Sequence, residues 1–123
     1  MTPFGERMRK LRGERGVTLK QMASAIGVSS AYLSALEHGK RGRPGWHLIQ
    51  RIISYFNIIW DEAEEVVRLA RISHPRITID TSGLDPKATE LANRLADDIG
   101  KLDVAALEQI MSTLDRHRQR LKG

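Results

Sequence analysis

Hydrophobic residues in the first 73 positions recur every three or four residues, in short runs that end at glycine or asparagine. This spacing puts them on one face of a helix and is typical of amphipathic helices around a shared core. Threonine, serine and aspartate stand where such helices would begin, and glycine where they would end. The pattern therefore predicts five helices, over about residues 3–12, 19–26, 30–37, 46–56 and 61–72.

A second pattern begins after His74-Pro75, because proline stops the fifth helix. Residues 76–80 alternate polar and β-branched side chains, which favours a short strand. Asp85 and Pro86 then suit a helix start, and apolar residues at helical spacing continue to Leu121 in two helices. We expect three parts: a domain over 1–73, a linker over 74–86 and a helical dimerisation module over 87–123.

These elements predict an all-α protein in which a five-helix domain precedes a two-helix module, with one short strand near 76–80. The composition agrees, because 41% hydrophobic and 28% charged residues over 123 positions are typical of a globular protein. No apolar run reaches the length of a membrane span, and the charged first 15 residues lack the apolar stretch of a signal peptide. We therefore expect a cytoplasmic protein without membrane contact.

The absence of cysteine excludes disulfides, thiolate-bound metals and a cysteine nucleophile. The acidic residues lie at helix starts or on polar helix faces, where they complement the helix dipole or solvent. The histidines are scattered, without the close spacing of a metal-binding pair: His38, His47, His74 and His117. We expect no metal, no cofactor and no enzymatic activity.

The positive charge is concentrated in the first half of the chain. Residues 1–57 hold ten Lys/Arg against three acids, a net charge of +7, whereas residues 58–123 hold ten against twelve, a net charge of −2. A polyanionic partner is therefore expected to bind the first half.

Residues 18–37 carry the pattern of two short helices joined by a tight turn. Ala23 is small enough for the next helix to cross close to it, and Gly27 suits a left-handed backbone at the turn. Val28 and Leu33 are expected to fill the angle between the helices, and Glu37 to pair with a nearby arginine or cap backbone inside the domain. The second helix then presents small polar side chains at its start, the end that enters the major groove in helix-turn-helix proteins.

The stretch TLKQMASAIGVSSAYLSALEHGK, over residues 18–40, resembles the XRE family, the phage-repressor and Cro type of helix-turn-helix. The resemblance covers about residues 1–73 and includes the basic loop that ends at Pro44. It implies a lambda-repressor-like, five-helix DNA-binding domain that is usually dimeric and reads an inverted repeat. Residues 74–123 are similar only to the short helical tails with which some such regulators dimerise.

By its place in this motif, the second helix is expected to contact bases. Related proteins often carry glutamine, arginine or asparagine there, which make bidentate contacts to adenine or guanine. The smaller residues of this chain imply fewer such contacts, more contact with thymine methyl groups and more dependence on DNA shape. The expected base-contacting residues are Ser30, Ala31, Tyr32 and Ser34, with phosphate as the alternative partner of the tyrosine hydroxyl.

Cations beside this helix are expected to bind the DNA backbone. The expected phosphate-contacting residues are Lys20, Ser29, Lys40, Arg41 and Arg43. The tetrapeptide Arg41-Gly42-Arg43-Pro44 leaves open a different interpretation, in which the loop inserts into the minor groove.

The apolar faces of the two C-terminal helices could pack on the first domain, pair as a hairpin or dimerise. A hairpin alone buries both faces poorly, so we expect a twofold dimer interface. The residues expected in this interface are Leu91, Leu95, Ile99, Leu107, Ile110 and Leu114. The strand near 76–80 is a further place where two copies would pair.

Together these features predict a sequence-specific transcriptional regulator of double-stranded DNA, acting as a homodimeric repressor. Its recognition helices would lie about 34 Å apart, one turn of DNA, and would cover a promoter. Two alternatives stay open: an antitoxin-like autorepressor whose tail binds a partner protein, and a protein-interaction adaptor that has lost DNA binding.

Overall fold

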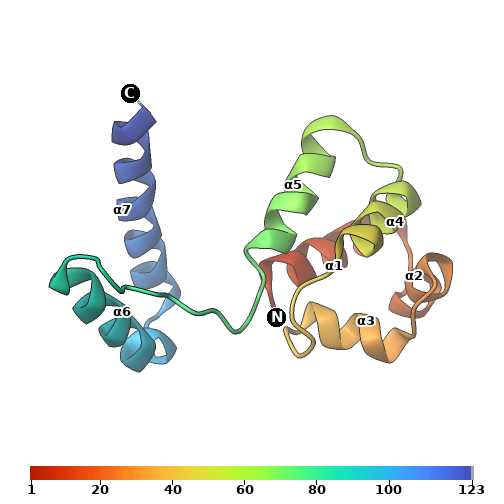
Figure 1. Cartoon of the computed structure of the whole chain (residues 1–123). Coiled ribbons are helices and arrows are strands. Elements are labelled where there is room, and N and C mark those ends of the chain that lie inside the picture. The colour runs from red at the N-terminus through yellow and green to blue at the C-terminus, as the bar shows by residue number, and fades with distance from the viewer. Residues whose placement is uncertain (123) are drawn as a thin grey trace. The chain divides into compact units, whose positions relative to one another are not determined.

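The computed structural model describes residues 1–122, which fall into two compact units with a boundary between residues 77 and 78. The N-terminal unit contains five helices (Figure 1): α1 (Pro3–Arg15), α2 (Leu19–Ile26), α3 (Ser30–Glu37), α4 (Trp46–Phe56) and α5 (Trp60–Arg71). The C-terminal unit contains α6 (Pro86–Asp98), the 3-10 turn η1 (Ile99–Lys101) and α7 (Val104–Lys122). The all-α expectation is confirmed.

The prediction of a strand near 76–80 is wrong, because residues 1–122 contain no strand. A strand needs a second strand to receive its backbone hydrogen bonds, and the described chain offers none to this segment. Ile77 and Ile79 therefore remain exposed, and the alternation that favoured a strand buries nothing within one chain.

One apolar core holds the N-terminal unit together. In it α1 packs against α3 and α5, α2 against α3 and α4, and α4 against α5. This arrangement follows from the helical spacing of the apolar residues, most of which turn inward. The side chains that are almost fully buried are Phe4, Met8, Met22, Leu33, Leu36, Ile52, Phe56 and Val66.

Two helix boundaries differ from those expected. Helix α1 continues through Gly13 to Arg15, and Gly16 ends it with a φ of 65° while its N–H donates to the Arg12 carbonyl. A glycine inside a helix weakens it without stopping it, whereas a left-handed glycine ends it. Helix α5 begins at Trp60, one residue before the aspartate expected to start it.

The end of α3 is held against the start of α1. The N–H and hydroxyl of Thr2 both donate to the Glu37 carbonyl oxygen, at 3.0 and 3.2 Å, and the Glu37 carboxylate pairs with Arg12. The Glu37 side chain is only 2% exposed, so the arginine partner expected from the sequence is what allows its charge to be buried. Ser73 closes the same corner by accepting a hydrogen bond from the Phe4 N–H at 2.9 Å.

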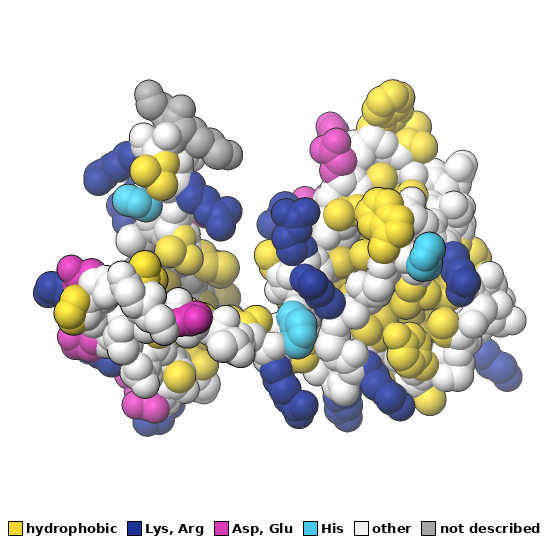
Figure 2. All heavy atoms as spheres, viewed as in Figure 1, with side chains coloured by type: hydrophobic (Ala, Val, Ile, Leu, Met, Phe, Trp, Pro, Cys, Tyr) yellow, Lys and Arg dark blue, Asp and Glu magenta, His cyan; other side chains and the backbone are white. Residues whose placement is uncertain are grey.

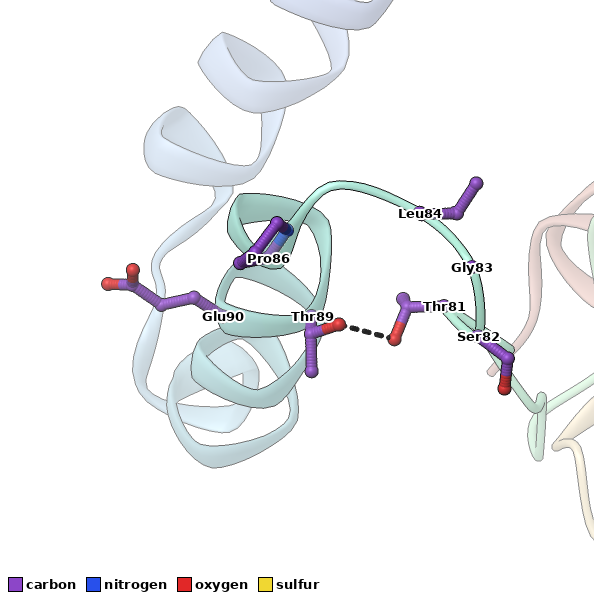
Figure 3. Close-up of a pocket in the computed structure, with 7 residues that line it drawn as sticks. All are labelled: Thr81, Ser82, Gly83, Leu84, Pro86, Thr89 and Glu90. Atoms are coloured by element: carbon purple, nitrogen blue, oxygen red, sulfur yellow. Dashed lines mark hydrogen bonds between the residues drawn. The ribbon is translucent and has the colours of Figure 1, made fainter.

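The C-terminal unit is ordered mainly by local hydrogen bonds. Thr81 and Thr89 bring their hydroxyls within 2.8 Å of each other, which joins the segment before α6 to that helix (Figure 3). Asp85 caps α6 by accepting from the Lys87 N–H, and hydrogen bonds from Ser82 lower the pKa of Asp80. No residue of α6 is buried, so this unit has little core of its own.

Two glycines of α1 should respond oppositely to substitution, because only one of them lies against α3. A Cβ at Gly5 would lie 2.1 Å from the Glu37 carbonyl oxygen, whereas a Cβ at Gly13 meets nothing within 4 Å. We expect Gly5→Ala to lower the free energy of unfolding by more than about 2 kcal/mol, through overpacking. Gly13→Ala should raise it by about 0.5–1 kcal/mol. Urea unfolding of the full chain measures both, and an unchanged stability for Gly5→Ala would contradict the contact.

Candidate nucleic-acid interface

The turn between α2 and α3 is built around one left-handed glycine. Gly27 has a φ of 81°, and its N–H donates to the carbonyls of Ala23 and Ser24. The Val28 N–H also donates to the Ala23 carbonyl, at 3.0 Å. These bonds satisfy the last carbonyls of α2 and reverse the chain sharply, which is the geometry of a helix-turn-helix.

Helix α3 begins immediately after this turn. The Ser29 hydroxyl caps it by accepting from the Tyr32 N–H at 3.0 Å, while Leu33 and Leu36 fix its inner face in the core. The capping bond uses only the acceptor capacity of the serine, so its O–H is still available to an outside acceptor.

The residues expected to contact bases do not share one environment. Ser30 and Ala31 are exposed in the first turn of α3, whereas Tyr32 and Ser34 are half-buried, and Tyr32 packs against the core. The start of α3 therefore exposes only short side chains, next to a half-buried tyrosine that packs against the core.

A basic loop follows α3 directly. Lys40, Arg41 and Arg43 are exposed, and buried Pro44 fixes the far end of the loop. None of the three cations takes part in the ion pairs found among residues 1–122. Figure 2 shows Lys and Arg side chains along the edge of the N-terminal unit that carries α3. The loop therefore presents unneutralised positive charge at the C-terminal end of α3, opposite to the end that carries Ser30 and Ala31.

Lys20 adds one more cation at the start of α2. Thr18 and Gln21 form a reciprocal capping box there, with hydrogen bonds of 2.9 and 3.0 Å. Lys20 lies between them in sequence and is exposed. The starts of α2 and α3 are thus both ordered by side-chain caps.

Sequence reasoning missed Arg51 of α4. Its guanidinium donates to the Ile26 carbonyl at 3.3 Å, at the end of α2, and it is the group nearest to a Cβ built at Gly27. Arg51 therefore ties α4 to the turn before α3. No signal in the sequence distinguishes this arginine from an ordinary solvated residue on the polar face of a helix.

The residues expected to dimerise belong to the C-terminal unit and are largely uncovered. Leu91, Ile99 and Leu114 are 58%, 55% and 60% exposed, and Ile110 is 38% exposed. Leu95 and Leu107 are half-buried. Helices α6 and α7 thus carry apolar faces that their own unit does not cover.

Within residues 1–122 there is no group of three or more His, Asp or Glu side chains placed to hold a metal ion. No helix in this part of the chain has the length and apolar character needed to cross a membrane.

Comparison with known proteins agrees with this geometry. A family model described as a helix-turn-helix domain matches residues 3–64, about half of the chain. The uncharacterized HTH-type transcriptional regulator RghRB of Bacillus subtilis (strain 168) is 38% identical over 61 residues, which cover 50% of this chain and 44% of that protein. The HTH-type transcriptional repressor RghR of the same organism is 41% identical over 61 residues, covering 50% and 45%.

A solved structure, that of a SinR protein/SinI protein complex, has a TM-score of 0.45 and 20% identity, and the alignment covers 98% of this chain and 99% of that chain. The curated relatives are more than twice as long as the stretch they share with this chain. The family model, by contrast, spans α1 to the first turns of α5 and includes the turn at Gly27. The resemblance seen in the sequence is confirmed, and the chain belongs to the helix-turn-helix family.

Proposed function

We propose that the protein is a cytoplasmic, sequence-specific transcriptional repressor that binds an inverted-repeat operator as a homodimer. One observation carries the proposal: α3 begins with exposed Ser30 and Ala31, and a loop of three unpaired cations follows its other end. A helix of this size fits the major groove, and cations next to it bind the flanking phosphates. Its relative RghR is named a transcriptional repressor.

In this proposal α3 reads the operator through its N-terminal half. The side chains of Ser30 and Ala31 are short, so Ala31 contacts thymine methyl groups and the Ser30 hydroxyl accepts or donates a single hydrogen bond. Ser34 and the hydroxyl of half-buried Tyr32 lie farther along the helix and reach a base or a phosphate at its edge. With no bidentate side chain in this set, sequence-dependent DNA shape supplies part of the specificity.

The backbone of the DNA is held by Lys20, the Ser29 hydroxyl and the loop of Lys40, Arg41 and Arg43. Lys20 and Ser29 sit at two capped helix starts, whose N–H groups and dipoles also favour phosphate. Insertion of Arg41 and Arg43 into the minor groove is the alternative for the loop, and it would make binding depend on A·T-rich flanks.

Dimerisation is assigned to α6 and α7. Their apolar faces stay exposed in one chain. Contiguous exposed apolar faces of this kind mark interaction sites. The proposed contact residues are Leu91, Leu95, Ile99, Leu107, Ile110 and Leu114. A partner protein bound to the same faces, as in an antitoxin-like autorepressor, is the second candidate, because the exposed surface would accept either.

The loop is tested by the salt dependence of DNA binding. Three neutralised phosphates give a slope of log K against log salt of about −2.7, at about −0.9 for each phosphate. Replacing two of the three cations, in Arg41→Ala/Arg43→Ala, should weaken binding to every duplex and reduce the magnitude of the slope by about 1.8. Fluorescence anisotropy with a labelled duplex measures the constants.

The control variant is Lys87→Ala/Arg94→Ala, which removes the same charge from exposed positions on α6. It should leave the salt slope of the wild type unchanged. An equal reduction of the salt slope in both variants would show that only net charge matters. An unchanged slope in the loop variant would show that the loop does not contact DNA.

The tail is tested by one charged substitution on each face of α7. Ile110→Asp should convert the dimer to a monomer in sedimentation velocity, because it places a charge in the apolar interface. Gln109→Asp, at the neighbouring residue on the opposite face, should remain dimeric. A wild-type chain that is monomeric alone but joins a second protein through the tail would favour the antitoxin-like alternative.

A further inference from the structure

The segment that follows α5 is tied to the N-terminal unit before the C-terminal unit begins. Ser73 is 3% exposed, its hydroxyl donates to the Leu69 carbonyl, and its oxygen accepts from the Phe4 N–H at 2.9 Å. Next to it, Nδ1 of the His74 ring accepts from the Arg76 N–H at 3.2 Å. Residues 73–76 therefore form a corner held by hydrogen bonds, although they belong to neither helix nor strand.

Pro75 places this corner against the end of α3. A Cβ built at Gly39 would lie 3.4 Å from the Pro75 Cβ and 3.8 Å from its Cγ. Gly39 directly precedes residues 40–43, the cationic loop. Figure 1 shows the chain leaving the lower end of α5 near the N-terminus and the loop after α3. The corner and the cationic loop are thus far apart in sequence and neighbours in space.

The backbone on both sides of this contact is restrained. Proline fixes its own φ and restricts the residue before it, and the Lys40 N–H donates to the Ala35 carbonyl at 2.8 Å. Consecutive Cα atoms are only about 3.8 Å apart. His74 and Arg76, one residue to either side of Pro75, therefore lie next to the start of the cationic loop.

Arg76 brings to the corner a positive charge that no acid neutralises. It is exposed, and none of the ion pairs found among residues 1–122 includes it. The acid at the adjoining end of α3 is Glu37, which is buried and already paired with Arg12. Arg76 and the cationic loop therefore form one group of unneutralised charge.

Such a group suits a ligand whose negative charges are closely spaced. Duplex DNA carries about one negative charge per 1.7 Å of its axis, so a cation beside the loop has a further phosphate within its reach. Guanidinium is well matched to phosphate, because its planar fork donates two parallel hydrogen bonds. The contact of the Arg76 N–H with His74 also fixes the backbone from which this side chain extends.

We propose that Arg76 is a further phosphate-binding residue, which holds the DNA backbone next to the phosphates bound by the cationic loop. Ser73 and Pro75 are positioning residues, because they fix the segment against Phe4 and Gly39. The inference rests on the proposed function, since it assumes that the loop meets DNA. It extends the interface from the helix-turn-helix to the segment that joins the two units, so the linker would begin at a point held on the DNA.

The inference is tested by the salt slope of Arg76→Ala in the full chain, measured by fluorescence anisotropy with a labelled duplex. Loss of one phosphate contact should reduce the magnitude of the slope by about 0.9. The affinity advantage of the wild type should then shrink about 3.5-fold between about 50 and 200 mM salt. Arg76→Lys keeps the charge and should keep the slope. Added to the loop variant Arg41→Ala/Arg43→Ala, Arg76→Ala should lower the slope by a further 0.9 or so, because it removes a separate phosphate contact.

The matched control is Arg71→Ala, which removes the same charge from the last turn of α5. Arg71 is exposed, lies outside the ion pairs found in the described chain, and lines a groove between α4 and α5. Its removal should leave the slope unchanged, and circular dichroism verifies that each variant is folded. A wild-type slope in Arg76→Ala, or an equal reduction in both variants, would overturn this inference alone. A wild type that binds no duplex would refute the proposed function and the inference with it.

A second measurement locates the contact on the DNA. The chain has no cysteine, so an iron–EDTA group can be attached to a single introduced one, in Arg76→Cys, Arg41→Cys or the control Arg71→Cys. Arg76→Cys should cut the backbone of a selected duplex within a few nucleotides of the sites cut from Arg41→Cys, because the reactive species act close to the iron. Cutting from Arg76→Cys that is no stronger than from Arg71→Cys would overturn the inference.

Discussion

The buried pair of Glu37 and Arg12 is the contact on which the position of α3 depends. Glu37 is the last residue of α3. Its carboxylate accepts hydrogen bonds from both terminal guanidinium nitrogens of Arg12 in α1, one of them at 3.2 Å. Its carbonyl oxygen accepts from Thr2 as well. Burying an ion pair adds little net stability, but loss of either partner would leave an uncompensated charge in the core. We therefore expect the pair to favour the one orientation of α3 in which both charges are compensated.

The opposite end of α3 is fixed by different means. Gly27 turns the chain, Ser29 caps the helix, and Arg51 of α4 holds the end of α2 in place. A helix of eight residues is too short to be stable alone, so these contacts at both ends keep it formed. This rigidity would suit the proposed contact with the major groove, because Ser30 and Ala31 have little reach to correct a misplaced helix.

Local signals in the sequence were enough to predict the helices and the helix-turn-helix. The caps at Thr2, Thr18, Ser29 and Asp85 all occur, because a capping side chain and its N–H partner are neighbours in sequence. A structural role for Glu37, an arginine partner or a backbone cap, could be predicted, but the choice between them and the identity of Arg12 depend on the packing of α1 on α3.

Features that depend on contacts between residues far apart in the sequence could not be predicted. The alternation in 76–80 could not say whether a second strand exists, and the exposure of Trp60 follows from where α5 begins. The role of Arg51 depends on α4 crossing near Gly27. The motif was enough to select the residues proposed to bind DNA. Their different exposures could not be predicted, because the half-burial of Tyr32 depends on its packing against the core.

The proposed base contacts are weak, and the proposed dimer compensates for this by combining two half-sites. A half-site read by serine, alanine and one tyrosine supplies little discrimination, and two linked half-sites multiply it. The most direct test is selection of binding sites from random duplex DNA by the full-length protein near physiological salt. The account predicts enrichment of an inverted repeat whose half-sites are centred about one helical turn apart. Salt-sensitive binding with no enriched sequence would contradict it.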